Sequence, residues 1–400
     1  MVRVTDRPQL SRRFAEVHSS PARDLLTLTS AHAEIISFAG GLPAKEAFDI
    51  EGLRSAVESL QLTPALLNYS TTEGMGDLRE LVASRLSAEG VPTTADGIVV
   101  TTGSQQALMM LAAVLVEPGA VVVVVRPSYL GMTQALTIAG ARLVSVESGA
   151  QGPDLEQLER VVVDHRPVLL YLNPTFQNPT GYTIPAPARA AIVEMAHRHG
   201  FRIVEDDPYR ELRYEAAPVP SFTSFDSGDA AEQVVIGTGS FSKVLAPGLR
   251  VGWMRPPADL RPAVNVAKQA FDLHSATITQ QIVVRYLLGG RFEGALERTR
   301  ALYRERRDAM VDLLDAALPS GSEWTIPTGG MFVWIRLPEG FDSIRLLEAA
   351  TAEGVVFSPG VPFYTDAPDT RRIRLSYTTN APDGIREGLQ RLAKAVDAAG

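Results

Sequence analysis

The chain is organised around the stretch Gly239-Ser240-Phe241-Ser242-Lys243-Val244-Leu245-Ala246-Pro247-Gly248-Leu249-Arg250-Val251-Gly252-Trp253. The apolar run at residues 234–236 that precedes it predicts a buried strand. The hydroxyls of Ser240 and Ser242 and the guanidinium of Arg250 suit the oxygens of a phosphate. Beside a phosphate and in largely apolar sequence, the amine of Lys243 suits a Schiff-base nucleophile. A strand end with a solvated lysine is the alternative interpretation.

Length and composition limit the class of protein. With 400 residues, 45% of them hydrophobic and 21% charged, we expect a globular chain of about two domains. No apolar run is long enough for a membrane span, and the first residues lack the apolar core of a signal peptide. The absence of cysteine excludes disulfides and thiolate metal sites and suits the cytoplasm. A net charge of −8 without any basic block argues against nucleic acid as a partner.

Predicted strands and helices alternate through the first part of the chain. We expect strands at residues 98–102, 121–125, 142–146, 168–172 and 201–204, and helices at residues 77–89, 105–116, 155–163 and 188–199. This alternation predicts a largely parallel sheet with helices on both faces. Ligands on such sheets lie at the carboxyl ends of the strands, so the polar groups that follow each strand are expected to meet there.

The pattern changes after residue 257. Helical patterns at residues 260–286 and 292–318 precede strands at 329–335, 355–357 and 373–377, a helix at 343–353 and a closing helix. These elements predict a smaller α+β domain. We therefore expect three parts: an N-terminal segment (1–55) that contributes to the small domain and the substrate entrance, a large α/β domain (56–288) and a small C-terminal domain (289–400).

Several blocks together resemble a known family. Asn178-Pro179-Thr180-Gly181, Asp206-Asp207-Pro208-Tyr209 and Lys243 follow successive strands with the spacing of fold-type I aminotransferases, which use pyridoxal phosphate. Blocks similar to the subgroup of 2-aminoadipate and branched-chain-type, multi-substrate aminotransferases are Ser37-Phe38-Ala39-Gly40-Gly41-Leu42-Pro43, Thr101-Thr102-Gly103-Ser104-Gln105-Gln106-Ala107-Leu108, Phe176-Gln177-Asn178-Pro179-Thr180-Gly181, Ala267-Lys268-Gln269, Gly329-Gly330-Met331-Phe332-Val333-Trp334 and Arg374-Leu375-Ser376-Tyr377. The resemblance covers nearly the whole chain. It implies an α/β enzyme that exchanges an amino group between an L-amino acid (glutamate, 2-aminoadipate, branched-chain or aromatic type) and a 2-oxo acid.

The resemblance assigns roles around the reactive part of the cofactor. Asp206 would keep the pyridine nitrogen protonated, with Asp207 as a neighbour that the family spacing disfavours. Asn178 and Tyr209 would hydrogen-bond the phenolic oxygen. Lys243 would hold the cofactor and later move the proton at the substrate α-carbon. Although the acids around Asp206 could suggest a metal site, no histidine ligand lies nearby in the sequence, so we expect no metal.

Other matches would bind the phosphate and the ring. Ser104 and Gln105 would offer backbone N–H groups at the start of a helix, which is a favourable place for an anion. Tyr129 would stack on the ring face, although an ordinary core tyrosine is an equal alternative. Tyr69 resembles the residue that reaches a phosphate across a subunit boundary in this family. It therefore implies a homodimer with shared active sites.

A further set would bind the substrate. Arg374 resembles the arginine that grips the α-carboxylate. Arg372 lies on the same face of the strand and is a rival, which the family motif disfavours. Gly40, or Gly41 beside it, would bring a backbone N–H close to that carboxylate, and Asn178 would lie near it. Ser20 and Arg23 match an N-terminal pair that reads a distal carboxylate in aminoadipate-type members. The alternative for Arg23 is a solvated helix position.

Two alternatives to transamination remain at this stage. The same cofactor supports elimination, decarboxylation and carbon–carbon bond formation, and pocket details select among them. An aminotransferase-like sensor domain of a transcription regulator is less favoured. Such regulators carry an N-terminal winged-helix module, and too few residues precede the first family block to form one. The residue pattern assigns no role to Asn173.

Overall fold

The computed structural model describes residue 32 and residues 34–215 and 217–399. Its largest sheet has eight strands in the spatial order β2, β9, β8, β7, β6, β3, β4, β5. Their bounds are β2 (Val99–Thr101), β3 (Val121–Arg126), β4 (Arg142–Gly149), β5 (Gly152–Pro153), β6 (Leu169–Leu172), β7 (Arg202–Asp206), β8 (Val235–Ser240) and β9 (Gly252–Arg255). Strands β4, β3, β6, β7 and β8 pair in parallel. Strand β9 is antiparallel to both β8 and β2, so β2 points the same way as the parallel strands.

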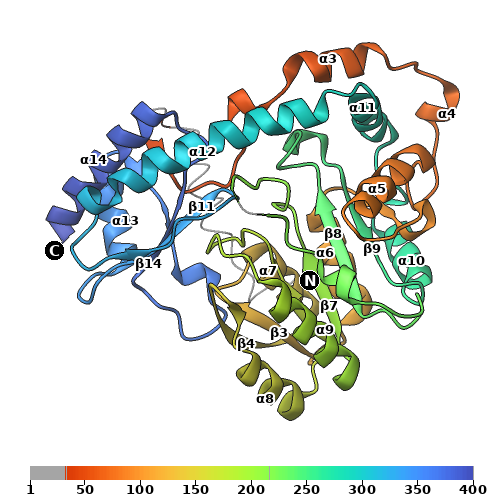
Figure 1. The fold of residues 1–400 in the computed structure, drawn as a ribbon, viewed down its shortest axis with the longest axis horizontal. Coiled ribbons are helices and arrows are strands. Elements are labelled where there is room, and N and C mark those ends of the chain that lie inside the picture. Colours follow the sequence, from red (N-terminus) through yellow and green to blue (C-terminus); the bar gives the residue numbers. More distant parts are fainter. Residues whose placement is uncertain (1–31, 33, 216, 400) are drawn as a thin grey trace, which may run out of the picture.

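Helices cover both faces of this sheet (Figure 1). One face packs against α6 (Ser104–Leu115), α7 (Leu130–Ala139) and α10 (Arg261–Asp272), and the other packs against α8 (Leu155–His165) and α9 (Ala186–His199). The side chains of β3 alternate between the two faces: Val122 and Val124 join the first cluster, and Val123 and Val125 join the second. A strand that is covered on both sides needs apolar residues at every position, which explains this run of valines.

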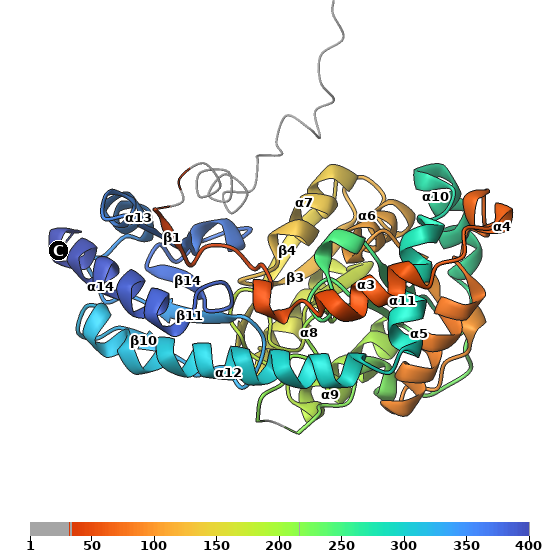
Figure 2. The ribbon, with the colours of Figure 1, turned by 90° about the horizontal axis from the view of Figure 1, so that it is seen from above.

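A second sheet has four strands in the order β10, β11, β14, β13 and is antiparallel. The bounds are β10 (Glu323–Trp324), β11 (Phe332–Arg336), β13 (Ser358–Pro359) and β14 (Arg372–Ser376). It lies with helices α13 (Ser343–Ala352) and α14 (Pro382–Ala399) at one end of the molecule. The long helix α12 (Phe292–Ala317) runs from this end towards α11 (Thr277–Leu288) in both Figure 1 and Figure 2. A parallel pair, β1 (Ile36–Ser37) with β12 (Val355–Val356), attaches the N-terminal segment to this end.

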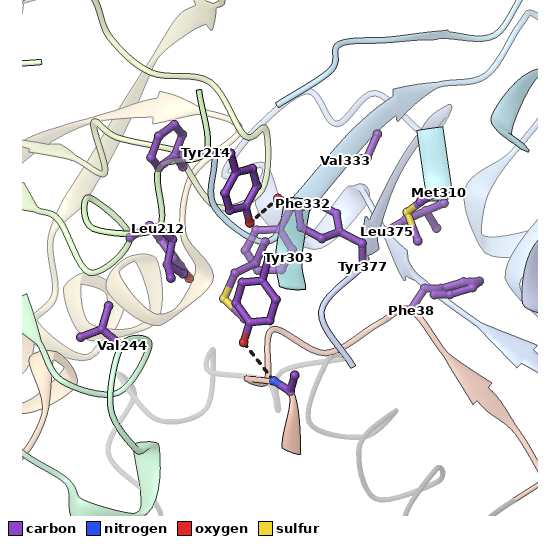
Figure 3. Packing of buried hydrophobic residues seen from close by; sticks show 14 of the residues in the cluster. Phe38, Leu212, Tyr214, Val244, Tyr303, Met310, Phe332, Val333, Leu375 and Tyr377 are labelled. Atoms are coloured by element: carbon purple, nitrogen blue, oxygen red, sulfur yellow. Dashed lines mark hydrogen bonds between the residues drawn. The ribbon is translucent and has the colours of Figure 1, made fainter. Parts of the chain in front are cut away.

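The core continues between the two sheets. Phe332 of β11, Tyr303 of α12 and Tyr214 belong to one buried cluster (Figure 3). Three buried phenols in it have partners: Tyr303 Oη accepts from the backbone N–H of Ala44 at 3.0 Å, and Tyr214 Oη lies 3.3 Å from Tyr377 Oη. These contacts tie the N-terminal segment, the small sheet and the end of the large sheet together.

The observed elements agree with the predicted alternation and differ in several details. The helical pattern predicted at 260–286 is interrupted, because Leu273 has a left-handed φ of 62° and separates α10 from α11. Strand β9 had no prediction, since Gly252–Arg255 has no apolar run. The helices α3 (Ile50–Glu58), α4 (Pro64–Leu67) and α5 (Gly76–Ala88) pack beside α11, and only α5 was predicted. Within the described part of the chain, no helix is long and apolar enough to cross a membrane.

Candidate active site

A cavity of about 700 Å³ opens where the predicted polar groups meet. Its walls come from the carboxyl ends of β3, β6, β7 and β8, the start of α6, and strand β14 of the small sheet. Its lining residues are Gly41, Leu42, Ser104, Gln105, Tyr129, Leu130, Gly131, Gln134, Asn173, Asn178, Asp206, Pro208, Tyr209, Ser240, Ser242, Lys243, Phe363 and Arg374. The expectation that the strand ends converge on one site is therefore correct.

Lys243 follows β8 and lines this cavity. Its Nζ donates to the carbonyl oxygen of Gly41 at 2.8 Å and lies 5.9 Å from the centre of the Tyr209 ring. Burial lowers the pKa of Lys243 to about 8, and the nearby cations Arg374 and Arg250 act in the same direction. A lysine with this environment supplies a neutral amine at lower cost than a solvated lysine does.

Asp206, the last residue of β7, is 2% exposed and lines the cavity. Its Oδ2 accepts from the phenol of Tyr171 at 2.8 Å, and its Oδ1 accepts from Thr238 Oγ1 at 2.9 Å. Burial raises the pKa of Asp206 to about 6. The adjacent Asp207 does not line this cavity; instead its Oδ2 accepts from Arg210 Nε at 2.8 Å. The structure thus separates the two acids: Asp206 lines the cavity and Asp207 does not.

The loop after β6 carries two asparagines with different functions. Asn173 donates from Nδ2 to the backbone oxygen of Asp206, and its Oδ1 accepts from the backbone N–H of Asn178 at 2.7 Å. It therefore joins this loop to the end of β7, a role that the residue pattern did not reveal. The side chain of Asn178 faces the cavity and accepts from Arg374 Nη1 at 2.6 Å. Tyr209 lines the cavity nearby, and burial raises its pKa well above the usual value.

Arg374 comes from β14 and is 3% exposed. Its Nη2 donates to the carbonyl oxygen of Ala39 and to Ser358 Oγ, the latter at 3.0 Å. Its guanidinium lies 4.2 Å from the centre of the Phe332 ring and 5.0 Å from that of Phe363. Burial lowers the pKa of Arg374 to about 10. The Nε atom is buried without a hydrogen-bond partner, so this guanidinium keeps a donor for an anion.

The rival Arg372 has a different environment. Its Nε donates to Asp369 Oδ2 at 3.1 Å, and the residue does not line the cavity. Arg371 also pairs with Asp369, at 3.3 Å. Among these three arginines, only Arg374 reaches the cavity.

The turn between β2 and α6 meets Arg250. Helix α6 begins at Ser104 after Gly103, whose φ of 73° favours glycine. A Cβ at Gly103 would lie 2.5 Å from Arg250 Nη2, and a Cβ at Gly252 would lie 2.8 Å from the backbone nitrogen of Ser104. Arg250 itself donates from Nη2 to the carbonyl oxygen of Thr102 at 3.3 Å. Helix N–H groups and a guanidinium are thus held together where no side chain intervenes.

Two serines and the pair Tyr129 and Gln105 also line the cavity. Ser240 Oγ donates to Ser242 Oγ at 2.9 Å, and the backbone N–H of Ser242 donates to Ser240 Oγ at 3.1 Å. Tyr129 precedes α7 and donates from its phenol to Gln105 Oε1 at 3.4 Å. Burial raises the pKa of Tyr129 to about 12. An ordinary tyrosine is already neutral at physiological pH, and burial keeps the phenol of Tyr129 neutral there.

Some predicted residues are not brought to the cavity. Tyr69 is 79% exposed in the single chain and packs edge-on against His274, with ring centres 5.9 Å apart. Gly40 is buried but does not line the cavity, whereas Gly41 does. Ser20 and Arg23 lie outside the described residues.

Sequence reasoning missed several lining residues and supports. Leu130, Gln134 and Phe363 line the cavity, and Tyr171 and Thr238 hold Asp206. Tyr171 lies within the apolar run of β6, and its hydroxyl was the only feature that set it apart from its neighbours. Gln134 and Thr238 are polar residues that no motif singled out, and Leu130 and Phe363 are apolar.

The residues present fit pyridoxal phosphate. Ser104, Ser240 and Ser242 line the cavity together with a lysine and a buried carboxylate. Arg250 is not part of the lining, but it contacts Thr102 in the turn before Ser104. An arginine with a free buried donor is available for a carboxylate. The fold and the site thus define a fold-type I enzyme that acts on amino acids with this cofactor.

Comparison with known proteins agrees. The family model described as aminotransferase class I and II matches residues 34–392, so the chain belongs to this family. It is 42% identical over 383 residues to a 2-aminoadipate transaminase of Thermus thermophilus, with 95% of this chain and 94% of that protein covered. It is 36% identical over 394 residues to aromatic-amino-acid aminotransferase 1 of Thermococcus litoralis, with 96% and 93% covered. The crystal structure of an alpha-aminoadipate aminotransferase from Thermus thermophilus, complexed with N-(5'-phosphopyridoxyl)-L-leucine, superposes with a TM-score of 0.90 at 39% identity and 97% coverage of both chains. The protein is a pyridoxal-phosphate-dependent transaminase of amino acids.

Proposed function

We propose that Lys243 is the residue that holds the cofactor and transfers the proton, and that the enzyme accepts both acidic and apolar amino donors. The observation that carries the first part is the position of Lys243. It lines the cavity with a pKa lowered to about 8, together with the carboxylate of Asp206. The bound cofactor withdraws electrons from the substrate α-carbon and makes its proton acidic. Once the donor has displaced it, the amine of Lys243 would move that proton from the substrate α-carbon to the cofactor carbon.

In this proposal the neighbouring residues set the electrostatics. Asp206 faces the pyridine nitrogen and keeps it protonated, which requires its own ionised form. The cationic partner would favour that form and offset the effect of burial, which raises the pKa of the carboxyl to about 6 in the protein alone. Asn178 and Tyr209 donate towards the phenolic oxygen, and Tyr129 forms the wall against the ring.

The phosphate is proposed to bind at the start of α6. Ser104 and Gln105 supply backbone N–H groups there, Ser240 and Ser242 supply hydroxyls, and Arg250 supplies the guanidinium. The contact of Arg250 with Thr102 brings the arginine to the same turn.

Arg374 is proposed to bind the substrate α-carboxylate. Asn178, Ala39 and Ser358 engage three of its five N–H groups, which fixes the orientation of the guanidinium and leaves Nε without a partner. The segment after β1, at Gly40 and Gly41, would supply a backbone N–H beside it. A carboxylate held there by the buried arginine would be common to every donor.

The substrate range rests on the cavity and on the relatives. Relatives of this chain are named for 2-aminoadipate and for aromatic amino acids. The wall formed by Leu42, Leu130 and Phe363 suits an apolar side chain, and Ser20 and Arg23 are proposed to meet a distal carboxylate. Glutamate, 2-aminoadipate, branched-chain and aromatic amino acids are the proposed donors, and 2-oxo acids are the acceptors.

We further propose a cytoplasmic homodimer in which Tyr69 completes the partner's site. Tyr69 contacts His274 between α10 and α11, and exposed apolar residues occur on the neighbouring segments: Leu67 in α4, Phe271 in α10, Leu273 directly after α10 and Ile278 in α11. The hydrogen bond from Thr277 Oγ1 to the carbonyl oxygen of Leu66, at 2.7 Å, joins these segments. Such a surface is unusual on a monomer and suits a second copy of the chain. The lack of cysteine suits a reducing compartment, and the proposed division into residues 1–55, 56–288 and 289–400 follows the two sheets.

Chemical trapping tests the central assignment. Borohydride reduction of the enzyme followed by peptide mapping should place the cofactor on Lys243, and Lys243→Ala should lose the reducible adduct. An adduct on Lys268 would disprove the assignment. A complementary measurement follows the absorbance of the bound cofactor. It should change with an amino acid alone and be restored by a 2-oxo acid alone, with no release of ammonia or carbon dioxide.

A further inference from the structure

Lysine is rare in this protein, and one lysine is completely buried outside the cavity. The 38 lysines and arginines include only four lysines, at Lys45, Lys243, Lys268 and Lys394. Lys45 and Lys394 are exposed, whereas Lys268 is 0% exposed and does not line the cavity. Burying an ammonium is costly unless its charge and its donors are compensated. The position of Lys268 therefore requires a specific set of partners.

Lys268 lies on α10 and has three acceptors for its three N–H groups. Its Nζ donates to Asp272 Oδ1 at 2.9 Å, to Ser275 Oγ at 3.0 Å and to Gln106 Oε1 at 3.1 Å. Asp272 lies one helical turn away and neutralises the charge. Every donor of the ammonium is thus used, which a planar guanidinium or an apolar side chain could not reproduce in the same space.

The same acceptors hold Thr102. The backbone N–H of Thr102 donates to Gln106 Oε1 at 2.8 Å, and its hydroxyl donates to Asp272 Oδ2 at 3.1 Å. The hydroxyl also lies 3.3 Å from Ser275 Oγ. Lys268 therefore orients each side chain that holds Thr102, although it does not touch Thr102 itself.

Thr102 begins the turn Thr102-Gly103-Ser104, here called the phosphate turn. Its carbonyl oxygen accepts from Arg250 Nη2 at 3.3 Å, and α6 begins two residues later at Ser104. The direction of the first N–H groups of α6 and the position of Arg250 thus both depend on where Thr102 is held. We propose that Lys268 is a positioning residue for the cofactor phosphate, acting through Gln106 and Asp272 on the phosphate turn. This inference rests on the proposed binding of the phosphate at that turn.

The test measures binding to the cofactor-free enzyme. Dissociation constants are determined by calorimetry for pyridoxamine phosphate and for pyridoxamine, which lacks the phosphate. Lys268→Met should weaken binding of pyridoxamine phosphate about tenfold, the order expected when a hydrogen bond to a charged group is lost. Binding of pyridoxamine should not change. Lys394→Met is the matched control at an exposed lysine and should change neither constant.

Two further variants separate the outcomes. Arg250→Ala tests the phosphate site itself: if it leaves pyridoxamine phosphate binding unchanged, the proposed phosphate site is wrong, whatever Lys268 does. If Arg250→Ala weakens binding and Lys268→Met does not, or weakens both ligands equally, only the positioning role is overturned. Should Lys268→Met fail to fold because Asp272 is left unpaired, Lys268→Met with Asp272→Asn removes both charges. Selective weakening in that double variant supports the role, and unchanged binding overturns it.

Discussion

Tyr171 donates a hydrogen bond from its phenol to Oδ2 of Asp206 at 2.8 Å, and Thr238 donates to Oδ1 at 2.9 Å. Both donors are neutral, so they orient the carboxylate without supplying a compensating cation. Burial is then the dominant effect, and it raises the pKa of Asp206 to about 6 from an ordinary value of 3.8. In the cofactor-free protein, ionising this carboxyl therefore costs more free energy than ionising a solvated one.

That cost predicts a pH dependence of stability. The folded state binds the Asp206 proton more tightly than the unfolded state, so the associated stability is present below about pH 4 and is lost as the pH rises to about 6. In the Asp206→Asn variant the side chain stays neutral at every pH, so the variant does not lose this contribution to stability. Between these pH values the cofactor-free wild type should lose roughly 3 kcal/mol relative to the variant. Urea unfolding of both proteins at several pH values measures this difference, and parallel profiles would contradict it.

Replacing Arg374 should affect all donors alike. Arg374→Lys keeps the charge but loses the planar fork that grips a carboxylate, so kcat/KM should fall about a hundredfold for glutamate and for leucine. Arg372→Lys on the same strand is the control and should change kcat/KM little, because Arg372 pairs with Asp369. A loss confined to one donor type would show that Arg374 reads the side chain instead of the α-carboxylate.

Two glycine variants distinguish the effect of backbone strain from that of the close contact between Gly103 and Arg250. Gly103→Ala introduces a Cβ at a φ of 73° and 2.5 Å from Arg250 Nη2, whereas Gly119→Ala introduces one at a φ of 86° with no atom within 4 Å. Both should lose stability from the backbone, and Gly103→Ala should lose more, because a φ of 73° with a ψ of 168° is a conformation essentially restricted to glycine. Only Gly103→Ala should also weaken cofactor binding, measured as the rate at which the cofactor dissociates on dilution. Equal dissociation rates in the two variants would exclude a role for the close approach.

A mixing experiment tests the shared site. Tyr69→Ala and Lys243→Ala each remove one residue of the proposed composite site, and each should be strongly impaired alone. After subunit exchange, a heterodimer has one site with both native residues, so activity should recover to at most half per dimer. Native mass spectrometry confirms that exchange has occurred. Recovery should be absent when Lys243→Ala is mixed with the double variant. If exchange is complete and activity does not return, Tyr69 does not act across subunits.

The sequence match at Arg23 predicts a change in specificity. Arg23→Ala should reduce turnover of glutamate and 2-aminoadipate ten- to a hundredfold, about 1.5–3 kcal/mol, the range for a hydrogen bond to a charged group. Turnover of leucine should hardly change, because Arg374 still binds the α-carboxylate. Steady-state kinetics with both donor types measures this. Level rates would indicate a surface residue, and equal losses would indicate a folding or closure defect.

Local sequence by itself determined most of the framework. Strands covered on both faces require continuous apolar runs, so β3, β6, β7 and β8 are visible as such in the residue pattern. Because parallel strands end at one edge of a sheet, the same pattern brings Tyr129, Asn178, Asp206 and Lys243 to one site. The pattern failed where a strand carries no apolar run, as in β9.

The tertiary structure decided which groups control that site. Tyr171 and Asp206 are 35 residues apart and meet only because β6 and β7 are neighbours in the sheet. Arg374 and Asn178 are 196 residues apart and meet because the small sheet packs over the ends of the large one. Whether a polar side chain lies in a cavity, behind it or at the surface depends on such long-range packing. A local sequence pattern contains the type of a residue and the periodicity of the residues around it. Neither of these specifies which distant residue the side chain will contact.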